Sequence, residues 1–187
     1  SGGASIAMGN QTLASGGGST AMGQDTKAFG GASTAMGFYT KASGDYSTAM
    51  GYSTEASGYA STAMGLNTTA SGNASTAMGD TTTASGNYST TMGEKTTASG
   101  YASTAMGGNT EANGENSTAM GLGATANGNL SVSMGYATRA SDYSSFIVGR
   151  LNLTGSTVTE SAIDFSLDNT AFVIGNGTDF DNRSDAL

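Results

Sequence analysis

Three groups of side chains in this sequence have the types and the spacing to do chemistry. Ten methionines recur in a regular series, eight tyrosines lie in the short gaps within that series, and an acidic cluster lies near the C-terminus. Thioethers offer adaptable apolar contact area, tyrosine rings offer stacking surfaces, and clustered carboxylates can bind calcium. The sequence therefore points to contact and binding rather than to the making and breaking of bonds.

The acidic cluster consists of Asp179, Asp181, Asn182 and Asp185. Its oxygen ligands are as dense as those of a calcium site, but the cluster lacks the spacing of an EF-hand loop and its closing glutamate. We therefore expect a polar turn in this segment and no metal site.

The composition excludes several classes of function. The chain has no Cys and no His, so it lacks a thiol nucleophile, an imidazole base and the usual ligands of zinc, haem and iron–sulfur clusters. Its acidic residues are scattered along the chain, so we expect no catalytic residues, no cofactor and no enzymatic activity. Six Lys and Arg against fourteen Asp and Glu leave a net charge of −8, which argues against nucleic acid as a partner. No stretch approaches the roughly 20 apolar residues of a spanning helix, so we expect no membrane insertion.

The elements that position these groups follow from a strict repeat of fourteen residues. One pentad has the form Ser-x-Ala-Met-Gly, and its copies begin at Ser5, Ser19, Ser33, Ser47, Ser61, Ser75, Ser89, Ser103 and Ser117, with degenerate copies at Ser131 and Ser145. A second pentad of the form Thr-x-Ala-Ser-Gly begins at Thr12, Thr26, Thr40, Thr54, Thr68, Thr82, Thr96 and Thr110, with degenerate copies at Ala124 and Thr138. Two residues separate consecutive pentads, so each repeat consists of two halves of seven residues.

Seven residues are also the period of a coiled coil, but each heptad here contains a Gly, which costs about 1 kcal/mol in a helix. Five residues followed by a two-residue corner instead predict a short strand and a tight turn. Side chains alternate across a strand, so Ser, Ala and Gly share one uniformly small face in the first pentad. We therefore predict an all-β fold, a parallel β-roll (β-solenoid) of 14-residue coils with two short strands per coil. Residues 1–149 form the array of about eleven coils, and residues 150–187 form a non-repeat β cap or connector.

The outer face of the first strand carries a column of apolar side chains. Its members are Met8, Met22, Met36, Met50, Met64, Met78, Met92, Met106, Met120, Met134 and Val148. Burial of ten Met is worth roughly 15–30 kcal/mol in gross terms, and a soluble monomer rarely exposes so much contiguous apolar surface. We therefore predict that this column lies in an interface between copies of the chain. The outer position of the second strand is polar and variable and is expected to face water.

All eight tyrosines lie in the two-residue corners. They are Tyr39, Tyr46, Tyr52, Tyr59, Tyr88, Tyr101, Tyr136 and Tyr143. Exposed aromatic rows are candidate ligand-binding platforms for sugar rings or for a protein partner. The alternative is that the rings pack on neighbouring corners or across a subunit boundary.

After Arg150 the fourteen-residue period ends. Ile163, Phe165 and Leu167 alternate with polar residues and predict a strand with one buried face, and residues 171–177 predict a second strand followed by a turn. Their larger side chains are expected to cap the open sheet edge of the last coil, which would otherwise favour end-to-end pairing.

The two alternating pentads resemble the head repeats of YadA-like trimeric autotransporter adhesins over residues 1–149. In that family the pentad usually reads Ser-Val-Ala-Ile-Gly, so Thr and Met here stand where Val and Ile stand. The resemblance implies a left-handed β-roll, a homotrimer, and display at the bacterial cell surface to bind host or matrix components. Residues 150–187 resemble segments that precede an intramolecular chaperone in trimeric fibre proteins of phages and bacteria.

These observations favour one function and leave two alternatives open. The favoured function is that of a non-enzymatic, extracellular adhesin head, a trimeric rod that attaches to a host or matrix protein, a glycan or another surface. The first alternative is a structural shaft or receptor-binding segment of a phage or phage-like tail fibre on a virion. The second alternative is an ice-binding β-solenoid, because regular Thr columns on a flat sheet can match an ordered water lattice. The Thr column shares its face with Met, which argues against this last function.

Overall fold

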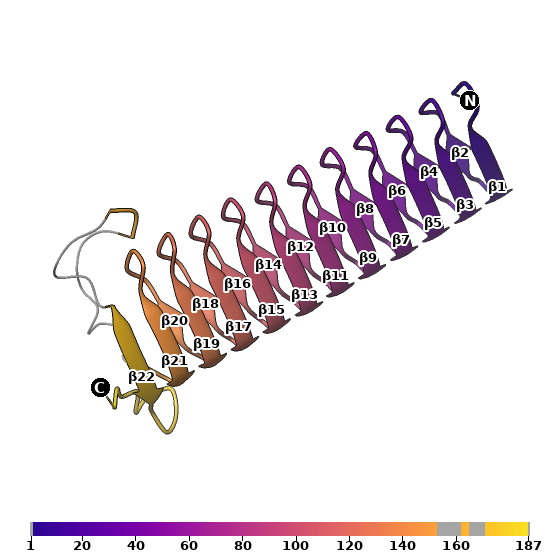
Figure 1. The fold of residues 1–187 in the computed structure, drawn as a ribbon. Helices are drawn as coiled ribbons and strands as arrows, with labels where there is room; N and C mark the ends of the chain where they lie inside the picture. Colours follow the sequence, from indigo (N-terminus) through magenta and orange to yellow (C-terminus); the bar gives the residue numbers. More distant parts are fainter. Residues whose placement is uncertain (1, 153–161, 165–170, 187) are drawn as a thin grey trace. The chain divides into compact units, whose positions relative to one another are not determined.

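A computed structural model of the chain describes residues 2–152, 162–164 and 171–186 (Figure 1). The chain divides into two compact units, Ser1–Glu94 and Lys95–Leu187. Each unit is built from five-residue strands that alternate along the chain with two-residue strands.

In unit 1 the five-residue strands form a parallel sheet in the order β1-β3-β5-β7-β9-β11-β13. They are β1 (Ile6–Asn10), β3 (Thr20–Gln24), β5 (Thr34–Phe38), β7 (Thr48–Tyr52), β9 (Thr62–Leu66), β11 (Thr76–Asp80) and β13 (Thr90–Glu94). The two-residue strands form a second parallel sheet in sequence order. They are β2 (Leu13–Ala14), β4 (Lys27–Ala28), β6 (Lys41–Ala42), β8 (Glu55–Ala56), β10 (Thr69–Ala70) and β12 (Thr83–Ala84).

Unit 2 repeats this arrangement and adds one strand from the end of the chain. Its five-residue strands are β15 (Thr104–Gly108), β17 (Thr118–Leu122), β19 (Val132–Tyr136), β21 (Phe146–Arg150) and β22 (Phe172–Asn176). Its two-residue strands are β14 (Thr97–Ala98), β16 (Glu111–Ala112), β18 (Thr125–Ala126) and β20 (Arg139–Ala140). Both sets pair in parallel within the unit.

The strand register keeps each residue type in its own column. Met22 pairs with Met36, and Ala21 pairs with Ala35, because every coil has the same length. The part of the chain that the structure describes contains strands, turns and bends but no helix. The prediction of an all-β parallel solenoid with 14-residue coils and two strands per coil is therefore confirmed.

The core between the two sheets consists of columns of very small side chains. Ala21 and Ala28 are fully buried and represent the two Ala columns, one from each sheet. The pentad serine is buried beside them, and in most coils its hydroxyl donates a hydrogen bond to the carbonyl oxygen of the glycine three residues earlier, as Ser19 does to Gly16 at 2.7 Å. The pentad threonine is also buried, but Oγ1 has no hydrogen-bond partner in Thr26, Thr40, Thr54, Thr68, Thr82, Thr96 and Thr110. The core of the regular coils before β21 is thus built from columns of Ala, Ser and Thr.

Glycine is required in two columns because successive coils approach each other closely there. Gly23 has a φ of +121°, and a Cβ on this residue would overlap the carbonyl oxygen of Gly37 in the next coil. Gly30 lies on the other side of the coil, where a Cβ would overlap the carbonyl oxygen of Gly44. The stacking distance between parallel strands thus explains the glycine register of the sequence.

Each corner contains a residue in the left-handed region of backbone conformation. Tyr46 has a φ of 59° and Ala60 has a φ of 53°, and equivalent values recur in successive corners. An L-residue in this conformation costs about 1–2 kcal/mol. The corner amides stabilise it by bonding to the preceding coil, as the Tyr46 amide does to the Gly31 carbonyl at 2.8 Å.

The strand predicted at residues 171–177 is present as β22, and it pairs with β21 in the register of the repeat. Val148 lies opposite Ile174, and Gly149 lies opposite Gly175. The segment after β22 then folds back, and Gly175 and Asp185 form an antiparallel bridge. Of the strand predicted around residues 163–167, Ile163 and Asp164 lie in a bend, and the other residues lie outside the described part of the chain.

Candidate binding surfaces

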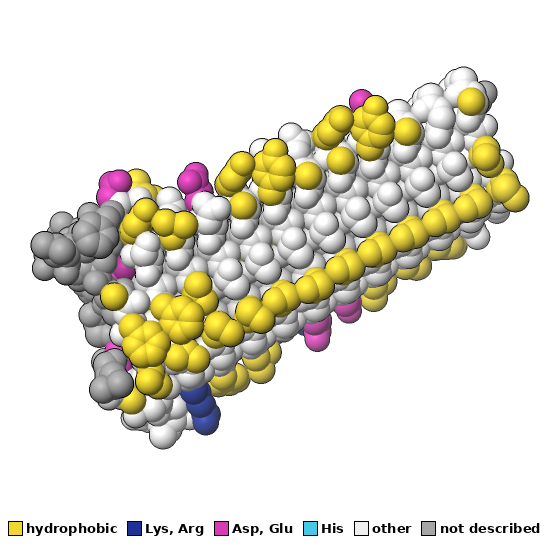
Figure 2. All heavy atoms as spheres, in the orientation of Figure 1, with side chains coloured by type: hydrophobic (Ala, Val, Ile, Leu, Met, Phe, Trp, Pro, Cys, Tyr) yellow, Lys and Arg dark blue, Asp and Glu magenta, His cyan; other side chains and the backbone are white. Residues whose placement is uncertain are grey.

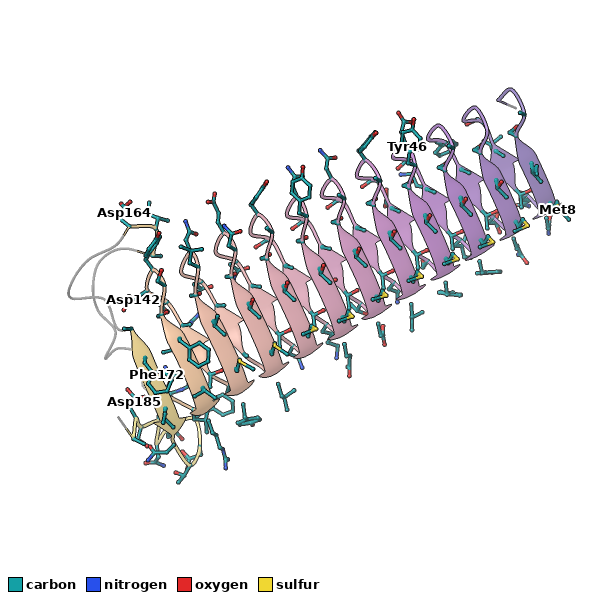
Figure 3. All side chains as sticks on the ribbon, viewed as in Figure 1. Met8, Tyr46, Asp142, Asp164, Phe172 and Asp185 are labelled. Atoms are coloured by element: carbon teal, nitrogen blue, oxygen red, sulfur yellow. The ribbon has the colours of Figure 1, made fainter. Side chains whose placement is uncertain are left out.

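The Met column lies on the outer face of the five-residue strands in both units. In unit 1, Met8 is 60% exposed and the methionines from Met22 to Met92 are half-buried by their neighbours. Figure 2 shows apolar side chains in a row along this face, and Figure 3 shows the sulfur atoms in line from Met8 onward. In unit 2 the column comprises Met106, Met120, Met134, Val148 and Ile174. The thioether groups are thus aligned but remain partly open to solvent within one chain.

A second column runs beside the methionines on the same face. It consists of threonines such as Thr48 and Thr62 in unit 1, which are half-buried. In unit 2 it changes to Val132, Phe146 and Phe172. The rings of Phe146 and Phe172 stack with centroids 5.7 Å apart and are 37% and 49% exposed. The face therefore becomes more apolar toward β22.

The outer face of the two-residue strands is polar except at the exposed Leu13 and Phe29 in the first coils. Lys41 and Glu55 form an ion pair of 2.8 Å on neighbouring coils, but both side chains are more than 40% exposed, so the pair contributes little to stability. In unit 2, the side-chain amide of Asn113 donates to Oδ1 of Asn127 at 2.9 Å. The predicted difference between a polar face and an apolar face is therefore present in the structure.

The tyrosines lie in two separate rows of corners. Tyr39, Tyr52 and Tyr136 lie in the Met-side corners, which we define as the two residues after each Met-Gly. The Ser-side corners, the two residues after the second pentad, carry Tyr46, Tyr59, Tyr88, Tyr101 and Tyr143. Tyr143 is half-buried, whereas the exposed fraction of the other seven ranges from 37% to 61%. The structure thus distributes the eight predicted binding residues over two rows and two units.

Some of these rings pack on each other rather than standing alone. Phe38 stacks on Tyr52 with centroids 5.3 Å apart and an interplanar angle of 13°. Tyr46 meets Tyr59 edge to face at 5.4 Å in the opposite row, and Figure 3 shows Tyr46 at the tip of its corner. Such pairs form small aromatic platforms that still expose about half of each tyrosine.

Asn and Asp in the Ser-side corners have a structural role that the sequence did not reveal. Asn73 Oδ1 accepts a hydrogen bond of 3.1 Å from the Tyr59 amide, and Asn87 Oδ1 accepts one of 2.9 Å from the Asn73 amide. Asp45 Oδ1 accepts a similar bond from Gly31. These side chains link each corner to the preceding one. The repeated Asn at this corner position is the sequence feature from which such links could have been predicted.

The acidic cluster near the C-terminus forms a turn. Asp179 Oδ1 accepts hydrogen bonds from the side-chain amide of Asn182 at 2.8 Å, from the Asn182 backbone amide and from the Asp181 backbone amide. These bonds, led by that from the Asn182 side chain, lower the pKa of Asp179 below its usual value. Within the described residues, no group of three or more acidic side chains could hold a metal ion. The carboxylate of Asp179 therefore organises the polar turn that the sequence predicted.

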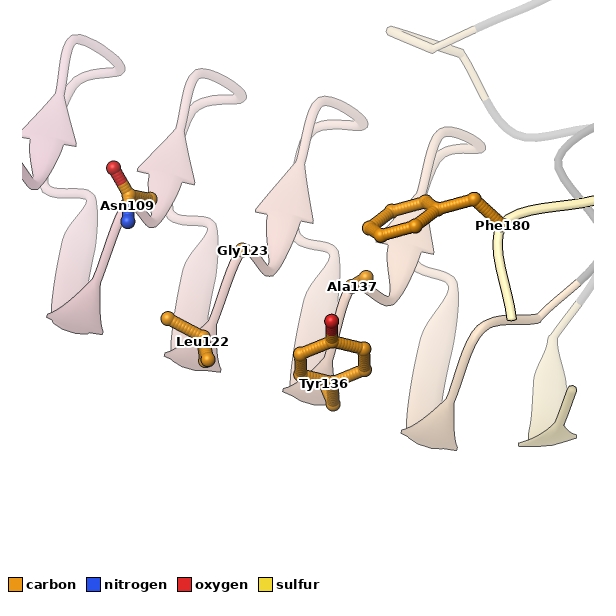
Figure 4. A pocket seen from close by; sticks show the side chains of 6 residues that line it. All are labelled: Asn109, Leu122, Gly123, Tyr136, Ala137 and Phe180. Atoms are coloured by element: carbon orange, nitrogen blue, oxygen red, sulfur yellow. The ribbon is translucent and has the colours of Figure 1, made fainter. Parts of the chain in front are cut away.

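A hollow that the sequence analysis missed lies at the Met-side corners of unit 2 (Figure 4). It has a volume of ≈ 310 Å³ and is lined by Asn109, Leu122, Gly123, Tyr136, Ala137 and Phe180. The rings of Tyr136 and Phe180 lie 6.3 Å apart and are tilted by 54°. Phe180 comes from the segment after β22, so sequence spacing provided no signal for this site.

Within the described residues, no helix has the length and apolar character needed to cross a membrane.

Comparison with known families identifies the repeat. The family model described as "YadA head domain repeat (2 copies)" matches residues 1–26, 14–40, 28–54, 42–68, 56–82, 70–93 and 98–124. Together these matches cover more than half of the chain. No curated protein matches the sequence.

Proposed function

Because the chain belongs to the family of YadA head domain repeats, we propose that it is the head segment of a trimeric, non-enzymatic surface adhesin. In this proposal three copies associate through the Met column, and the assembly is displayed outside a bacterial cell. The corners that remain exposed then attach to a host or matrix protein or to a glycan.

The Met column is the observation that carries the proposal. Its thioethers are aligned in register but only half-buried in the single chain, and the neighbouring column adds threonine methyl groups and, near β22, two stacked phenylalanines. A large contiguous apolar face on a soluble protein typically marks an interface. Coils of equal length keep the column in register along each chain, so a second and a third copy can dock side by side along it.

The tyrosine corners support the attachment role. They protrude at the coil ends, away from the small-residue core, and repeat along the chain, so an assembly of three copies presents many equivalent rings. Multivalent presentation of weak sites raises overall avidity without any new contact. The tyrosines at these corners are the candidate contact residues for a protein or glycan partner.

Sedimentation velocity on the intact chain tests the assembly. We expect a trimer for the wild type and a shift to monomer for the double variant Met50→Lys/Met64→Lys, because each lysine would bury a charge in the interface. The matched control is Thr69→Lys/Thr83→Lys, which places the same charges on the outer face of β10 and β12 and should leave the trimer intact. A wild-type chain that sediments as a monomer contradicts the proposal.

A second measurement tests attachment separately. Tyr46→Ser/Tyr59→Ser and Tyr39→Ser/Tyr52→Ser each remove a pair of exposed rings from one corner row. We expect each variant to remain trimeric and to bind about tenfold less tightly to an immobilised matrix protein or glycan array that captures the wild type. Unchanged capture by both variants would remove the tyrosines from the binding surface.

A further inference from the structure

The hollow at the Met-side corners of unit 2 has the form of a small-molecule site. Its volume of ≈ 310 Å³ is at the lower end of the range of about 300–1,000 Å³ that is typical of ligand pockets. Tyr136 and Phe180 provide two non-parallel aromatic surfaces, and Leu122 and Ala137 add aliphatic groups to the lining. Asn109 adds a side-chain amide, a hydrogen-bonding group, to the lining.

Two arginines flank these rings, although the chain as a whole has a net charge of −8. The guanidinium of Arg150 lies 5.3 Å from the centroid of the Tyr136 ring, and that of Arg183 lies 5.3 Å from the centroid of Phe180. Arg183 Nη1 also donates to the Ala137 carbonyl at 3.0 Å, which fixes the Phe180 segment beside the corner. Two of the six basic residues of the chain therefore lie next to one aromatic hollow.

Arg150 has donor groups available for a ligand. It is exposed, and it uses Nη2 to donate to the Thr178 carbonyl at 2.7 Å. Within the described residues its guanidinium contacts the Thr178 carbonyl and the Tyr136 ring and no carboxylate. A guanidinium carries five N–H donors, so Arg150, which lies beside the lining residue Tyr136 without lining the hollow itself, still has donors for the carboxylate of a ligand next to that ring.

We propose that this hollow binds an acidic sugar, a pyranose ring that carries a carboxylate. The apolar face of the sugar stacks on one of the two aromatic rings and its edge packs on the other, the carboxylate pairs with Arg150, and the Asn109 amide bonds a ring hydroxyl. A neutral apolar ligand would use the rings but not the arginine, and a bare anion would use the arginine but not the rings. The proposal deepens the attachment function proposed above and rests on it for its biological meaning.

Titration of the intact chain with methyl glucuronide and with methyl glucoside, followed by saturation-transfer NMR, tests this site. The two probes share the pyranose ring and differ in the carboxylate. We expect the glucuronide to bind about tenfold more tightly than the glucoside, because a charge-assisted pair with Arg150 is lost in the neutral sugar. Equal affinity for the two probes, or no binding of the glucuronide, would overturn the proposal.

Substitutions at Phe180 and at Arg150 test the aromatic contact and the charged contact of the proposed sugar site separately. Phe180 is 63% exposed, so Phe180→Ala should retain the fold while weakening glucuronide binding by about tenfold. Arg150→Gln should abolish the preference for the charged probe, and Arg150→Lys should restore most of it. Leu130→Ala, an exposed Ser-side corner residue of the same unit, is the matched control and should bind as the wild type does.

Sedimentation of Phe180→Ala distinguishes failure of this site from failure of the proposed assembly. Since the hollow lies within one chain, we expect this variant to remain trimeric while losing affinity for the glucuronide. Undiminished affinity in Phe180→Ala would locate the sugar elsewhere and overturn the inference.

Discussion

Two regions of unit 2 differ in how they fill the space between the sheets. The central inward position of the five-residue strands is Ala105 in β15 and Ala119 in β17, but Ile147 in β21 and Val173 in β22. All four side chains are buried, with at most 4% exposure. The regular strands of unit 2 thus carry Ala, or Ser133 in β19, where the last two strands carry a branched aliphatic side chain.

The difference shows that the regular coils depend on backbone stacking rather than on a large apolar core. Their two sheets are joined by two-residue corners, which leave room only for Ala, Ser and Thr. β21 follows the same kind of corner, but its neighbour β22 arrives after a long connection and is followed by the turn at Asp179. Ile147 and Val173 there form a small buried apolar cluster with Ala140.

The largest expected effect comes from a change in the glycine columns of the regular coils. Gly51 has a φ of +122°, and a Cβ there would overlap the carbonyl oxygen of Gly65. We expect Gly51→Ala to destabilise the chain by more than ~3 kcal/mol, because both the conformation and the contact are unfavourable. The measurement is the unfolding midpoint in guanidinium.

Gly17→Ala is the control for this experiment. An added Cβ at Gly17 meets no atom within 4 Å, so its stability should change by less than ~0.5 kcal/mol. Equal effects of the two substitutions would show that coil stacking does not set the glycine register.

A reciprocal exchange tests the contrast between the two cores. Ala119→Ile should destabilise the chain by ~1–3 kcal/mol or more, because the rigid coil cannot widen. Ile147→Ala should cost ~2–5 kcal/mol, because it leaves a cavity in the end core. Thermal unfolding of both variants measures the effects, and a neutral Ala119→Ile would contradict the view that corners limit the size of core residues.

The smallest expected change in stability concerns the buried threonines, where two similar substitutions should act in opposite directions. Thr110 Oγ1 has no hydrogen-bond partner, whereas Thr138 Oγ1 accepts a bond of 2.9 Å from Ser133. We expect Thr110→Val to stabilise the chain by about 1 kcal/mol, and Thr138→Val to destabilise it by a similar amount because Ser133 then loses its acceptor. Denaturant titration of the pair measures this difference, and changes of the same sign would contradict it.

Much of the regular structure could be predicted because every coil repeats the same local information. The alternation of Ser, Ala and Gly with Thr and Met indicated which side chains face inward, and the structure confirms this in the buried Ala21 and the half-buried Met22. The separation of the polar and apolar outer faces followed from the same pattern. The left-handed corner residues could not be predicted, because residues as different as Tyr46, Ala60 and Asn67 occupy them.

The composition and period of this sequence suffice to establish the solenoid, its small core and its apolar Met column, because parallel in-register stacking turns a repeat along the chain into a column in space. The end of the array depends instead on contacts between residues far apart in the sequence. The pairing of β22 with β21 and the bond from Arg183 to Ala137 join segments that share no period. Such contacts form only when the folded chain brings the segments together, which is why the hollow between Tyr136 and Phe180 emerged from the three-dimensional arrangement alone.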